Sequence, residues 1–200
     1  VDSLELEDGY ILADGKPAIS LEELAMESYY SLGNSSVLTA EVSKQVKKNT
    51  VASGCCFVDI EVDMKLGKIK VLDIINVHDS GTLLNPQLAE MQVHGGMSMG
   101  MGYGLSEQLL LDEKTGRPLN GTLLDYKMMT TMDTPDLAVE FVELNDPMGP
   151  YGNKALGEPP AIPGAPAIRN AVLHATGVGF SEIPLTPQRL IEGFTKAGLI

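Results

Sequence analysis

The feature that most constrains the fold is a pair of alternating segments separated by a short turn. The first, residues 50–63, alternates apolar and polar positions, most clearly in residues 57–62 (FVDIEV). A turn at residues 66–68 (LGK) follows, and residues 69–77 form the second segment. Alternation with a period of two is typical of a half-buried strand, and two such strands with a short turn between them form a hairpin. The sequence therefore predicts an antiparallel hairpin in the middle of the chain.

The rest of the chain mixes further strands with helices. We expect a hairpin-like opening over residues 4–18, extended segments at 109–111 and 126–129, and a strand over 137–145. Capping residues and apolar periodicity predict helices over residues 20–32, 87–111, 165–177 and 188–197. This mixture predicts an α+β (mixed α/β) protein, with mixed sheets and hairpins packed by helices, rather than a doubly wound parallel sheet.

Composition excludes several classes of protein. The 200 residues are enough for one domain or two small ones, and 44% hydrophobic with 20% charged residues is ordinary for a globular chain. The net charge of −13 disfavours nucleic acid as a partner, because binding phosphates needs clustered Lys and Arg. No apolar run approaches the roughly 18 to 20 residues of a membrane-spanning helix. The first residues have no signal peptide pattern and no initiator Met, so we expect a start internal to a longer protein or an engineered boundary.

The cysteines and histidines do not predict a metal site. Cys55 and Cys56 are adjacent in an apolar stretch, and we expect them to be buried free thiols in a reducing, cytoplasmic environment. The three histidines, His78, His94 and His174, are too far apart in the sequence to indicate a ligand set. We therefore expect no residue of this chain to bind a metal directly.

A glycine- and proline-rich segment over residues 146–166 contains the most conspicuous carboxylate. Residues 154–160 (KALGEPP) place Glu158 between Gly157 and Pro159. Pro159 keeps Glu158 out of the α region, and Gly157 allows a neighbour to come close to the backbone. Local sequence alone favours a role for Glu158 at the N-terminus of the next helix, where negative charge is stabilising by about 0.3 to 1 kcal/mol. The alternative is a catalytic carboxylate on a stiff loop.

The predicted helix that begins near residue 87 is unusually rich in glycine. Each glycine inside a helix costs about 1 kcal/mol relative to alanine, so several of them indicate close approach by another helix or by a ligand. Neither the dinucleotide-binding glycine pattern nor the phosphate-binding loop is present. Gln92 carries an amide that both donates and accepts hydrogen bonds, which suits an oxo ligand or the edge of a heterocycle. We expect the methionines of this segment to pack in the core: Met91, Met97, Met99 and Met101.

Two groups of motifs resemble one known family. Residues 79–86 (DSGTLLNP) followed by 92–96 (QVHGG) resemble the D-x-G-x-x-x-N-P and Q-V-x-G segments of the molybdenum subunits of xanthine dehydrogenases and aldehyde oxidoreductases. Residues 154–160 (KALGEPP) resemble the K-x-x-G-E-P-P signature of the same subunits. Further segments match in order from about residue 21 to the C-terminus, and the wording is most similar to bacterial xanthine dehydrogenase.

The resemblance implies a role for the chain and for particular residues. Residues 1–200 would be the C-terminal portion of the molybdopterin-binding domain, a fragment of a larger subunit or a separate chain that pairs with the remaining half. Glu158 would be the catalytic general base. The residues expected to contact the molybdenum–molybdopterin cofactor are Gln92, Val93, Gly95, Lys154 and Gly157, and Lys154 would lower the pKa of Glu158 if it lay close.

The resemblance also implies a reaction and partners. The enzyme would oxidise an electron-poor carbon of a purine such as xanthine or hypoxanthine, with water as the oxygen source. Nicotinate, another N-heterocycle or an aldehyde are alternative substrates, and an isolated apo domain without activity is an alternative state. Since the cofactor lies between two halves in this family, the chain alone is expected to lack molybdopterin. The [2Fe–2S] clusters and FAD are expected on other domains or subunits.

Overall fold

The computed structural model describes residues 3–30, 37–43 and 48–200, and it divides the chain into two compact units. Unit 1 comprises residues Val1–Gln45 and unit 2 comprises Val46–Ile200. The boundary falls between the predicted N-terminal helix and the predicted central hairpin. The candidate site residues all lie in unit 2.

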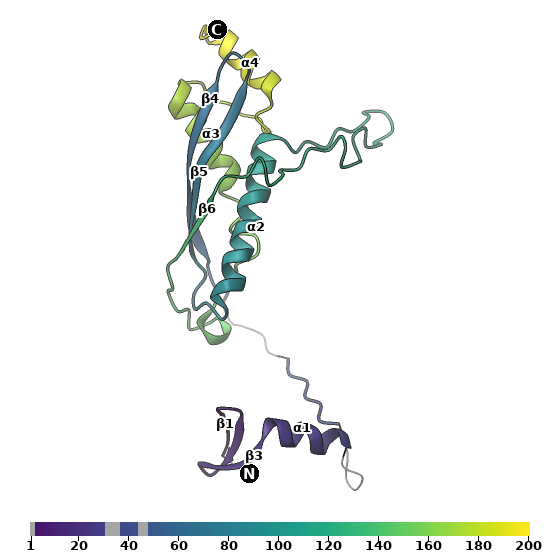
Figure 1. Ribbon diagram of the computed structural model, residues 1–200, viewed down its shortest axis with the longest axis vertical. Coiled ribbons are helices and arrows are strands. Elements are labelled where there is room, and N and C mark those ends of the chain that lie inside the picture. Colours follow the sequence, from purple (N-terminus) through teal and green to yellow (C-terminus); the bar gives the residue numbers. More distant parts are fainter. Residues whose placement is uncertain (1–2, 31–36, 44–47) are drawn as a thin grey trace. The chain divides into compact units, whose positions relative to one another are not determined.

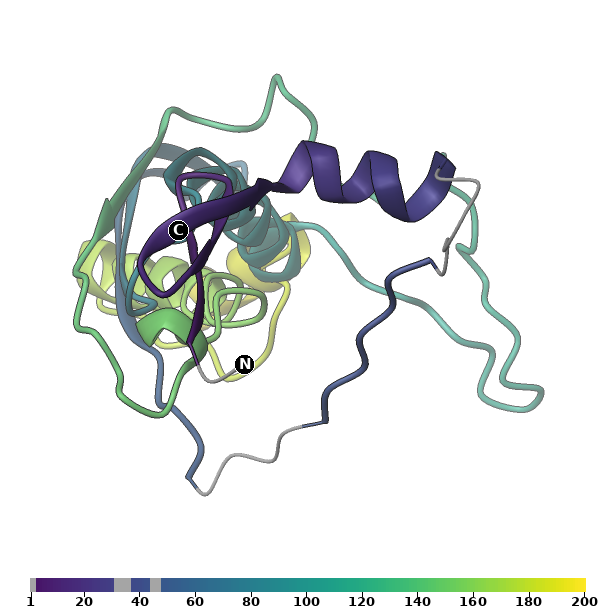
Figure 2. The ribbon, with the colours of Figure 1, turned by 90° about the horizontal axis from the view of Figure 1, so that it is seen from below.

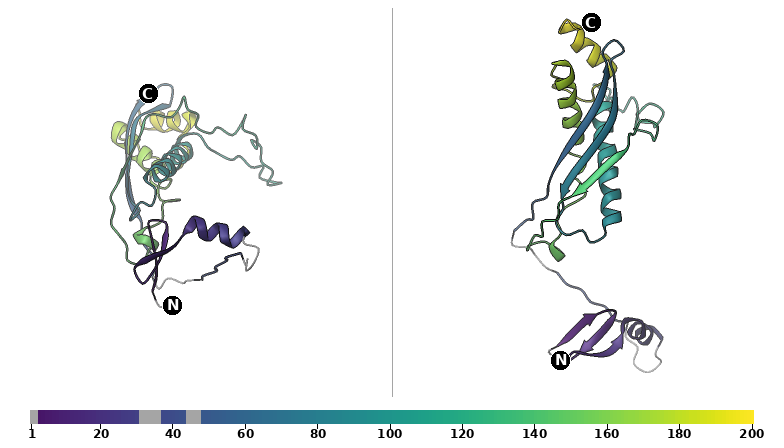
Figure 3. Two further views of the ribbon diagram at one scale, coloured as in Figure 1. Left: turned by 60° about the horizontal axis from the view of Figure 1, so that its bottom comes forward. Right: turned by 60° about the vertical axis from the view of Figure 1, so that its left-hand side comes forward.

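Unit 1 contains a small antiparallel sheet and one helix. The strands are β1 (Leu4–Glu7), β2 (Tyr10–Ala13) and β3 (Lys16–Ser20), paired in the order β1-β2-β3 (Figure 3). Asp8-Gly9 makes the first turn, with φ values of 46° and 79°, and Asp14-Gly15 makes the second, with φ values of 52° and 73°. Positive φ at both central residues is the geometry of a tight hairpin turn, which Asp-Gly favours. The predicted hairpin is confirmed and has a third strand.

A reciprocal cap begins helix α1 (Leu21–Tyr30). The Ser20 hydroxyl accepts from the Glu23 amide at 3.1 Å, and Glu23 Oε2 accepts from the Ser20 amide at 3.2 Å. This arrangement satisfies two amides that the first turn of a helix leaves without partners. The predicted helix is confirmed over these residues, and its last two positions, 31–32, lie outside the described residues.

The predicted central hairpin forms the main part of the sheet in unit 2. Strands β4 (Ser53–Asp63) and β5 (Lys68–Asp79) pair antiparallel, and β6 (Leu137–Phe141) joins β5 in parallel, giving the order β4-β5-β6. Two of the three strands are thus a hairpin and the third is parallel. This mixed sheet confirms the expected α+β class.

A β-bulge changes which face β5 turns to the core. Ile60 pairs with Val71 and Asp59 with Asp73, so Leu72 is an extra residue on β5. A bulge of one residue reverses the alternation beyond it, because side chains repeat with a period of two. Val71 is buried before the bulge, whereas Ile74, Asn76 and His78 are buried after it. The polar end of β5 therefore faces the interior.

Helices cover one face of this sheet (Figure 1). They are α2 (Pro86–Leu105), α3 (Gly164–Thr176) and α4 (Pro187–Lys196), with a short 3-10 turn η1 at Pro150–Gly152. Helix α2 packs against α3, and α3 against β4. The core between these layers consists of Val71, Ile74, Val93, Met97, Met101, Ile168, Val172, Leu185, Leu190 and Phe194.

The chain after α2 forms a long loop that extends away from the sheet and helices of unit 2 (Figures 1 and 2). The loop returns to them by Met129, which packs against the core. Helix α2 ends at Leu105, not near residue 111 as predicted, because the amides of Ser106 and Glu107 both bond to the Gly102 carbonyl. The turn predicted at Thr115-Gly116 is confirmed, with Gly116 at a φ of 69°. Residues 126–129 follow a turn at 122–126 and form no strand.

The cysteines only partly match the prediction. Both are free thiols, as expected, but Cys55 is exposed and Cys56 is half-buried. They alternate on β4, so Cys56 packs against the core while Cys55 lies on the opposite face. Burial, followed by the neighbouring Cys55, raises the pKa of Cys56 to about 11. None of the helices in the described part of the chain is long and apolar enough to span a membrane.

Candidate functional site

Glu158 lies in an open groove beside helix α2. The groove has a volume of about 710 Å³ and is lined mainly by apolar atoms. The residues that share it with Glu158 include Gly157, Met99, Tyr103, Ile162 and Pro166. Glu158 is exposed, whereas Pro160, two residues later, is fully buried. The carboxylate is thus accessible while its own segment is anchored in the core.

Three glycines of α2 allow the Glu158 segment to lie directly on the helix. They are spaced four residues apart at Gly96, Gly100 and Gly104. A Cβ atom would lie 2.6 Å from the Pro160 side chain at Gly96, 2.8 Å from the Ala161 carbonyl oxygen at Gly100, and 3.1 Å from Ala165 at Gly104. Residues at i and i+4 share one face of a helix, so these glycines form one continuous track. The predicted close approach is therefore made by residues 160–165.

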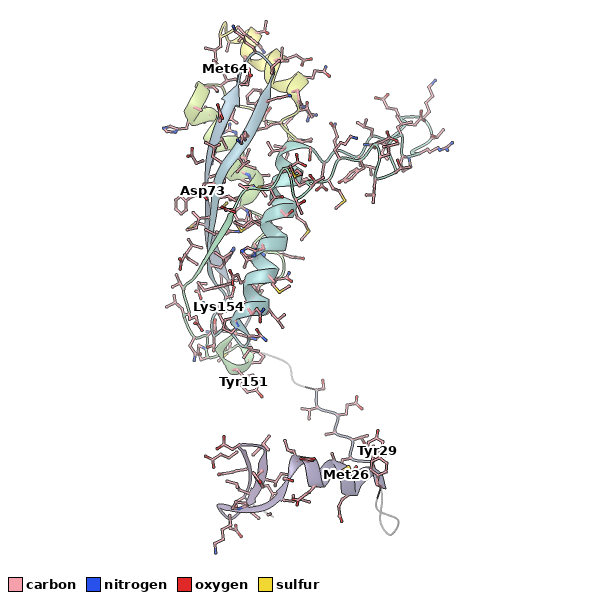
Figure 4. All side chains as sticks on the ribbon, in the orientation of Figure 1. Met26, Tyr29, Met64, Asp73, Tyr151 and Lys154 are labelled. Atoms are coloured by element: carbon pink, nitrogen blue, oxygen red, sulfur yellow. The ribbon has the colours of Figure 1, made fainter. Side chains whose placement is uncertain are left out.

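A buried ion pair joins the two motif regions. Lys154 Nζ donates to Asp79 Oδ2 at 2.5 Å, and each side chain is only 9% exposed. Asp79 Oδ1 also accepts from the amides of Gly81 and Leu144. The hydrogen bond from Lys154 holds the pKa of Asp79 below its ordinary value. Burial acts in the opposite direction and raises this pKa, whereas the two backbone amides lower it further. Lys154 lies next to Tyr151 at one end of unit 2, with Met64 at the opposite end (Figure 4).

This ion pair corrects one expectation. Lys154 was expected to contact the cofactor and to lower the pKa of Glu158 if it lay close. Its ammonium group is instead committed to Asp79. The Lys154 amide also bonds to the Ser80 carbonyl at 2.7 Å, so both its backbone and its side chain fasten the segment before Glu158 to the end of β5.

The Asn-Pro pair of the first motif sets the start of α2. Asn85 caps the helix by accepting from the Leu88 amide at 3.1 Å, and Pro86 occupies the first turn, where no amide hydrogen is needed. From this start, Gln92, Gly95 and Met99 are all exposed at spacings of three and four residues. They share one face of the helix, with Gln92 about 10 Å from Met99 along the axis. The face that carries Gln92 therefore continues to the Glu158 groove.

Two of the predicted site residues, Gly95 and Gly157, have no packing role within the described residues. A Cβ atom at Gly95 or at Gly157 would meet no atom of the described chain within 4 Å. Gly95 nevertheless stands inside a helix, where it costs about 1 kcal/mol relative to alanine. Both positions therefore leave open space beside the backbone.

The other predicted residues divide between core and surface. Val93 is 0% exposed and belongs to the core, so its side chain does not face the groove, and its expected cofactor contact stays a prediction. Met97 and Met101 pack in the core as expected, but Met91 and Met99 are 60% and 56% exposed. On α2, His94 Nε2 lies 3.9 Å from Glu90 Oε1, one turn earlier in the helix. In the described ranges 3–30, 37–43 and 48–200, no group of three or more His, Cys, Asp or Glu side chains is arranged to hold a metal ion.

The groove also contains residues that the sequence did not indicate. Tyr103 stands four residues after Met99 and is 63% exposed, and Glu107 follows just beyond the helix. The Tyr126 hydroxyl donates to Glu107 Oε2 at 2.9 Å, and this bond raises the pKa of Tyr126. The sequence did contain a signal for Tyr103. Met99 follows Gln92 by seven residues and Tyr103 follows Met99 by four, a spacing that places all three on one face of a helix.

Comparisons with known proteins place these features in context. A family model described as "Molybdopterin cofactor-binding domain" matches residues 1–135. The putative xanthine dehydrogenase molybdenum-binding subunit of Escherichia coli is 53% identical over 185 residues, which are 92% of this chain and 25% of that protein. The aldehyde oxidoreductase molybdenum-binding subunit of the same organism is 34% identical over 152 residues, which are 76% of this chain and 20% of that protein.

A solved structure shows the same fold. The reconstituted CO dehydrogenase from Oligotropha carboxidovorans superposes with a TM-score of 0.79 at 27% identity, covering 98% of this chain and 25% of that one. The chain thus spans about a quarter of the length of the relatives that it matches.

Proposed function

The chain belongs to the molybdopterin cofactor-binding domain family, and from this premise we propose that it forms one wall of the active site of a xanthine dehydrogenase-type molybdenum hydroxylase. Glu158 is the general base of that site. The observation that carries the proposal is the exposed Glu158 on an anchored segment. It lies beside a helix face that bears Gln92 and Gly95, and a Cβ at Gly95 would meet no neighbouring atom. The chain acts as the C-terminal portion of the molybdopterin-binding domain.

The residues present fit a bound pterin cofactor. Gln92 offers an amide donor and acceptor on the open face of α2. Gly95, one turn later, and Gly157, beside Glu158, provide backbone surfaces on which a ligand can lie without meeting a side chain. These three residues would contact the cofactor from this side. The remaining half of the subunit supplies the other side, and [2Fe–2S] and FAD groups on further domains or subunits accept the electrons.

Glu158 is suited to moving a proton. A bound molybdenum cofactor would supply a Lewis acid and a two-electron acceptor for the substrate. Glu158 would take up and hold a proton at its carboxylate. Pro159 restricts the backbone of Glu158, and the Ala161 amide donates to the Glu158 carbonyl at 3.0 Å, closing a turn. The base is therefore held on a short, stiff frame.

The substrate is a purine such as xanthine or hypoxanthine. This assignment rests on the 53% identity to a protein named as a xanthine dehydrogenase subunit. An aldehyde is the second candidate, because an aldehyde oxidoreductase subunit is 34% identical. Both substrates, like nicotinate or another N-heterocycle, present an electron-poor carbon, so the role of Glu158 is the same for each.

The proposal is tested by replacing Glu158 with Gln in the intact, assembled enzyme. Glutamine keeps the size of the side chain but cannot accept the proton, so we expect turnover to fall by at least about 100-fold at unchanged molybdenum content. Glu61→Gln is the matched control, because Glu61 is exposed on β4, on the face of the sheet away from the core. Turnover in Glu158→Gln within a few-fold of the Glu61→Gln control would contradict the assignment.

A further inference from the structure

The buried side chain of Asn76 ties the residues that follow Glu158 to the sheet. Asn76 is 0% exposed, and its Nδ2 donates to the Pro160 carbonyl oxygen at 3.1 Å. Pro160 is two residues beyond Glu158 and is itself fully buried. This is a contact between residues 84 positions apart, so local sequence does not create it. It connects the centre of the sheet to the turn that bears the proposed base.

The bulge in β5 is what makes this contact. Without the extra residue at Leu72, alternation from Val71 would turn Asn76 to the opposite face of the sheet. With it, three polar side chains on alternate residues face the interior: Asn76, His78 and Ser80, each no more than 3% exposed. Bulges are frequent next to active sites, where they redirect a side chain. Burying a polar row costs free energy, so its placement needs a reason beyond packing.

The hydrogen bonding of this row singles out Asn76. Within the described residues, Asn76 Oδ1, both ring nitrogens of His78 and the Ser80 hydroxyl have no partner. The Asn76 amide nitrogen is the one side-chain group of the row for which the described structure gives a hydrogen bond, and that bond is to Pro160. On the other side, Pro160 is in close contact with Gly96 of α2. The turn is thus held between the sheet and the helix.

We propose that Asn76 is a positioning residue for Glu158, holding the turn over residues 158–161 so that the carboxylate is presented in the groove. This inference rests on the proposed function for its catalytic consequence, but not for its structural one. Loss of the amide donor leaves the buried Pro160 carbonyl without a partner and releases the turn from the sheet. A displacement of about 1 Å at a reacting group can cost on the order of 100-fold in rate.

The structural part is tested by hydrogen exchange on the 200-residue chain. Asn76→Leu keeps the approximate size and removes the donor, and Asn76→Ala removes it without adding bulk. We expect amide exchange in a peptide covering residues 157–162, which includes the Ala161 amide, to speed up by about 10-fold or more in both variants. Ser80→Ala is the matched control, since it removes a buried hydroxyl that has no partner among the described residues. Unchanged exchange in both folded Asn76 variants, or equal acceleration in Ser80→Ala, would overturn the proposal.

The catalytic part is tested in the assembled enzyme. We expect Asn76→Ala to lower kcat by about 10-fold with KM within about twofold and molybdenum content unchanged, and Ser80→Ala to leave all three near wild type. A rise in KM with normal kcat would contradict a positioning role. If Glu158→Gln retained full turnover, the proposed function would fail, whereas localised exchange in the Asn76 variants would still establish that Asn76 holds the turn.

Discussion

The buried Asp79–Lys154 pair fixes the segment that carries the proposed base, Glu158, to the end of β5. Asp79 ends β5, and Lys154 stands four residues before Glu158. The carboxylate is further satisfied by two backbone amides, which is the condition under which a buried charge is tolerated. Each of the two motif segments that resemble one family therefore contributes one residue to this ion pair.

Removal of one partner of this pair is expected to destabilise unit 2. Lys154→Met keeps the length of the side chain but leaves Asp79 charged and without its cation, at a cost of about 3 kcal/mol. Urea denaturation of the chain measures this loss. The double variant Asp79→Asn with Lys154→Met serves as the control, and we expect it to recover part of the stability. A single variant as stable as wild type would show that the pair contributes nothing.

His78 gives unit 2 a pH dependence of its own. Burial lowers the pKa of His78 below its ordinary value of 6.5, so the folded chain takes up this proton at a lower pH than the unfolded chain does. In the unfolded chain His78 takes up a proton as the pH falls through about 6.5, which favours unfolding below that pH. Asp79, whose pKa is lowered in the folded state, adds a second loss as the pH falls through its ordinary value of 3.8 and below.

We therefore expect the free energy of unfolding to fall between about pH 7 and pH 5. Urea denaturation at several pH values, with His78→Gln as the comparison, measures the contribution of the histidine. The variant should lose the dependence in this window and keep the loss near pH 4. An identical profile for both proteins above pH 5 would show that His78 is not responsible.

At the scale of elements, helix α2 combines two kinds of glycine. Gly100 is pressed against the Ala161 carbonyl and Gly164, whereas Gly95 faces open space. An alanine is better than glycine in a helix interior by about 1 kcal/mol when nothing opposes it. Substitutions at the two positions should therefore act in opposite directions.

We expect Gly100→Ala to lower the Tm of the chain and Gly95→Ala to raise it. At Gly100 the new Cβ lies 2.8 Å from a backbone oxygen that cannot move without shifting the Glu158 segment. At Gly95 the chain gains helix propensity, but the assembled enzyme should retain less molybdenum. Thermal unfolding and metal analysis give the two measurements. A stabilising Gly100→Ala would contradict the close packing, and full molybdenum retention in Gly95→Ala would remove the argument for a ligand there.

The elements that could be predicted from the sequence are those whose signals are local. Asp-Gly turns, the Ser20–Glu23 cap and the Asn85-Pro86 start of α2 each depend on residues a few positions apart. The features that escaped prediction depend on register and on distant partners. The bulge at Leu72, the parallel pairing of β6 and the Lys154–Asp79 contact all arise from tertiary structure.

The candidate site follows the same division. Glu158 and the surrounding motif could be recognised from residue order, and Gly95 and Gln92 from a glycine-rich helix. The burial of Val93 and the exposure of Met99 could not be predicted, because the faces of α2 depend on where the helix meets the sheet. Asn76 carried no local signal at all, since its inward direction depends on a single extra residue in β5.

At the scale of the whole molecule, unit 2 exposes apolar side chains around the site. Leu88, Met91, Met99 and Tyr103 are each at least 56% exposed along α2. An exposed apolar surface of this kind marks a region that binds something. In our account the cofactor and the remaining half of the subunit cover it, which agrees with a chain spanning about a quarter of its relatives.

The most direct test of the account is the molybdenum content of the chain with and without that remaining half. We predict that the 200 residues expressed alone contain essentially no molybdenum or pterin, because in our proposal one amide and two open glycines would contact the cofactor from one side only. Co-expressed with the rest of a matching subunit, the chain should be recovered with about one molybdenum per complex. Stoichiometric molybdenum in the chain purified alone would contradict a site shared between two halves.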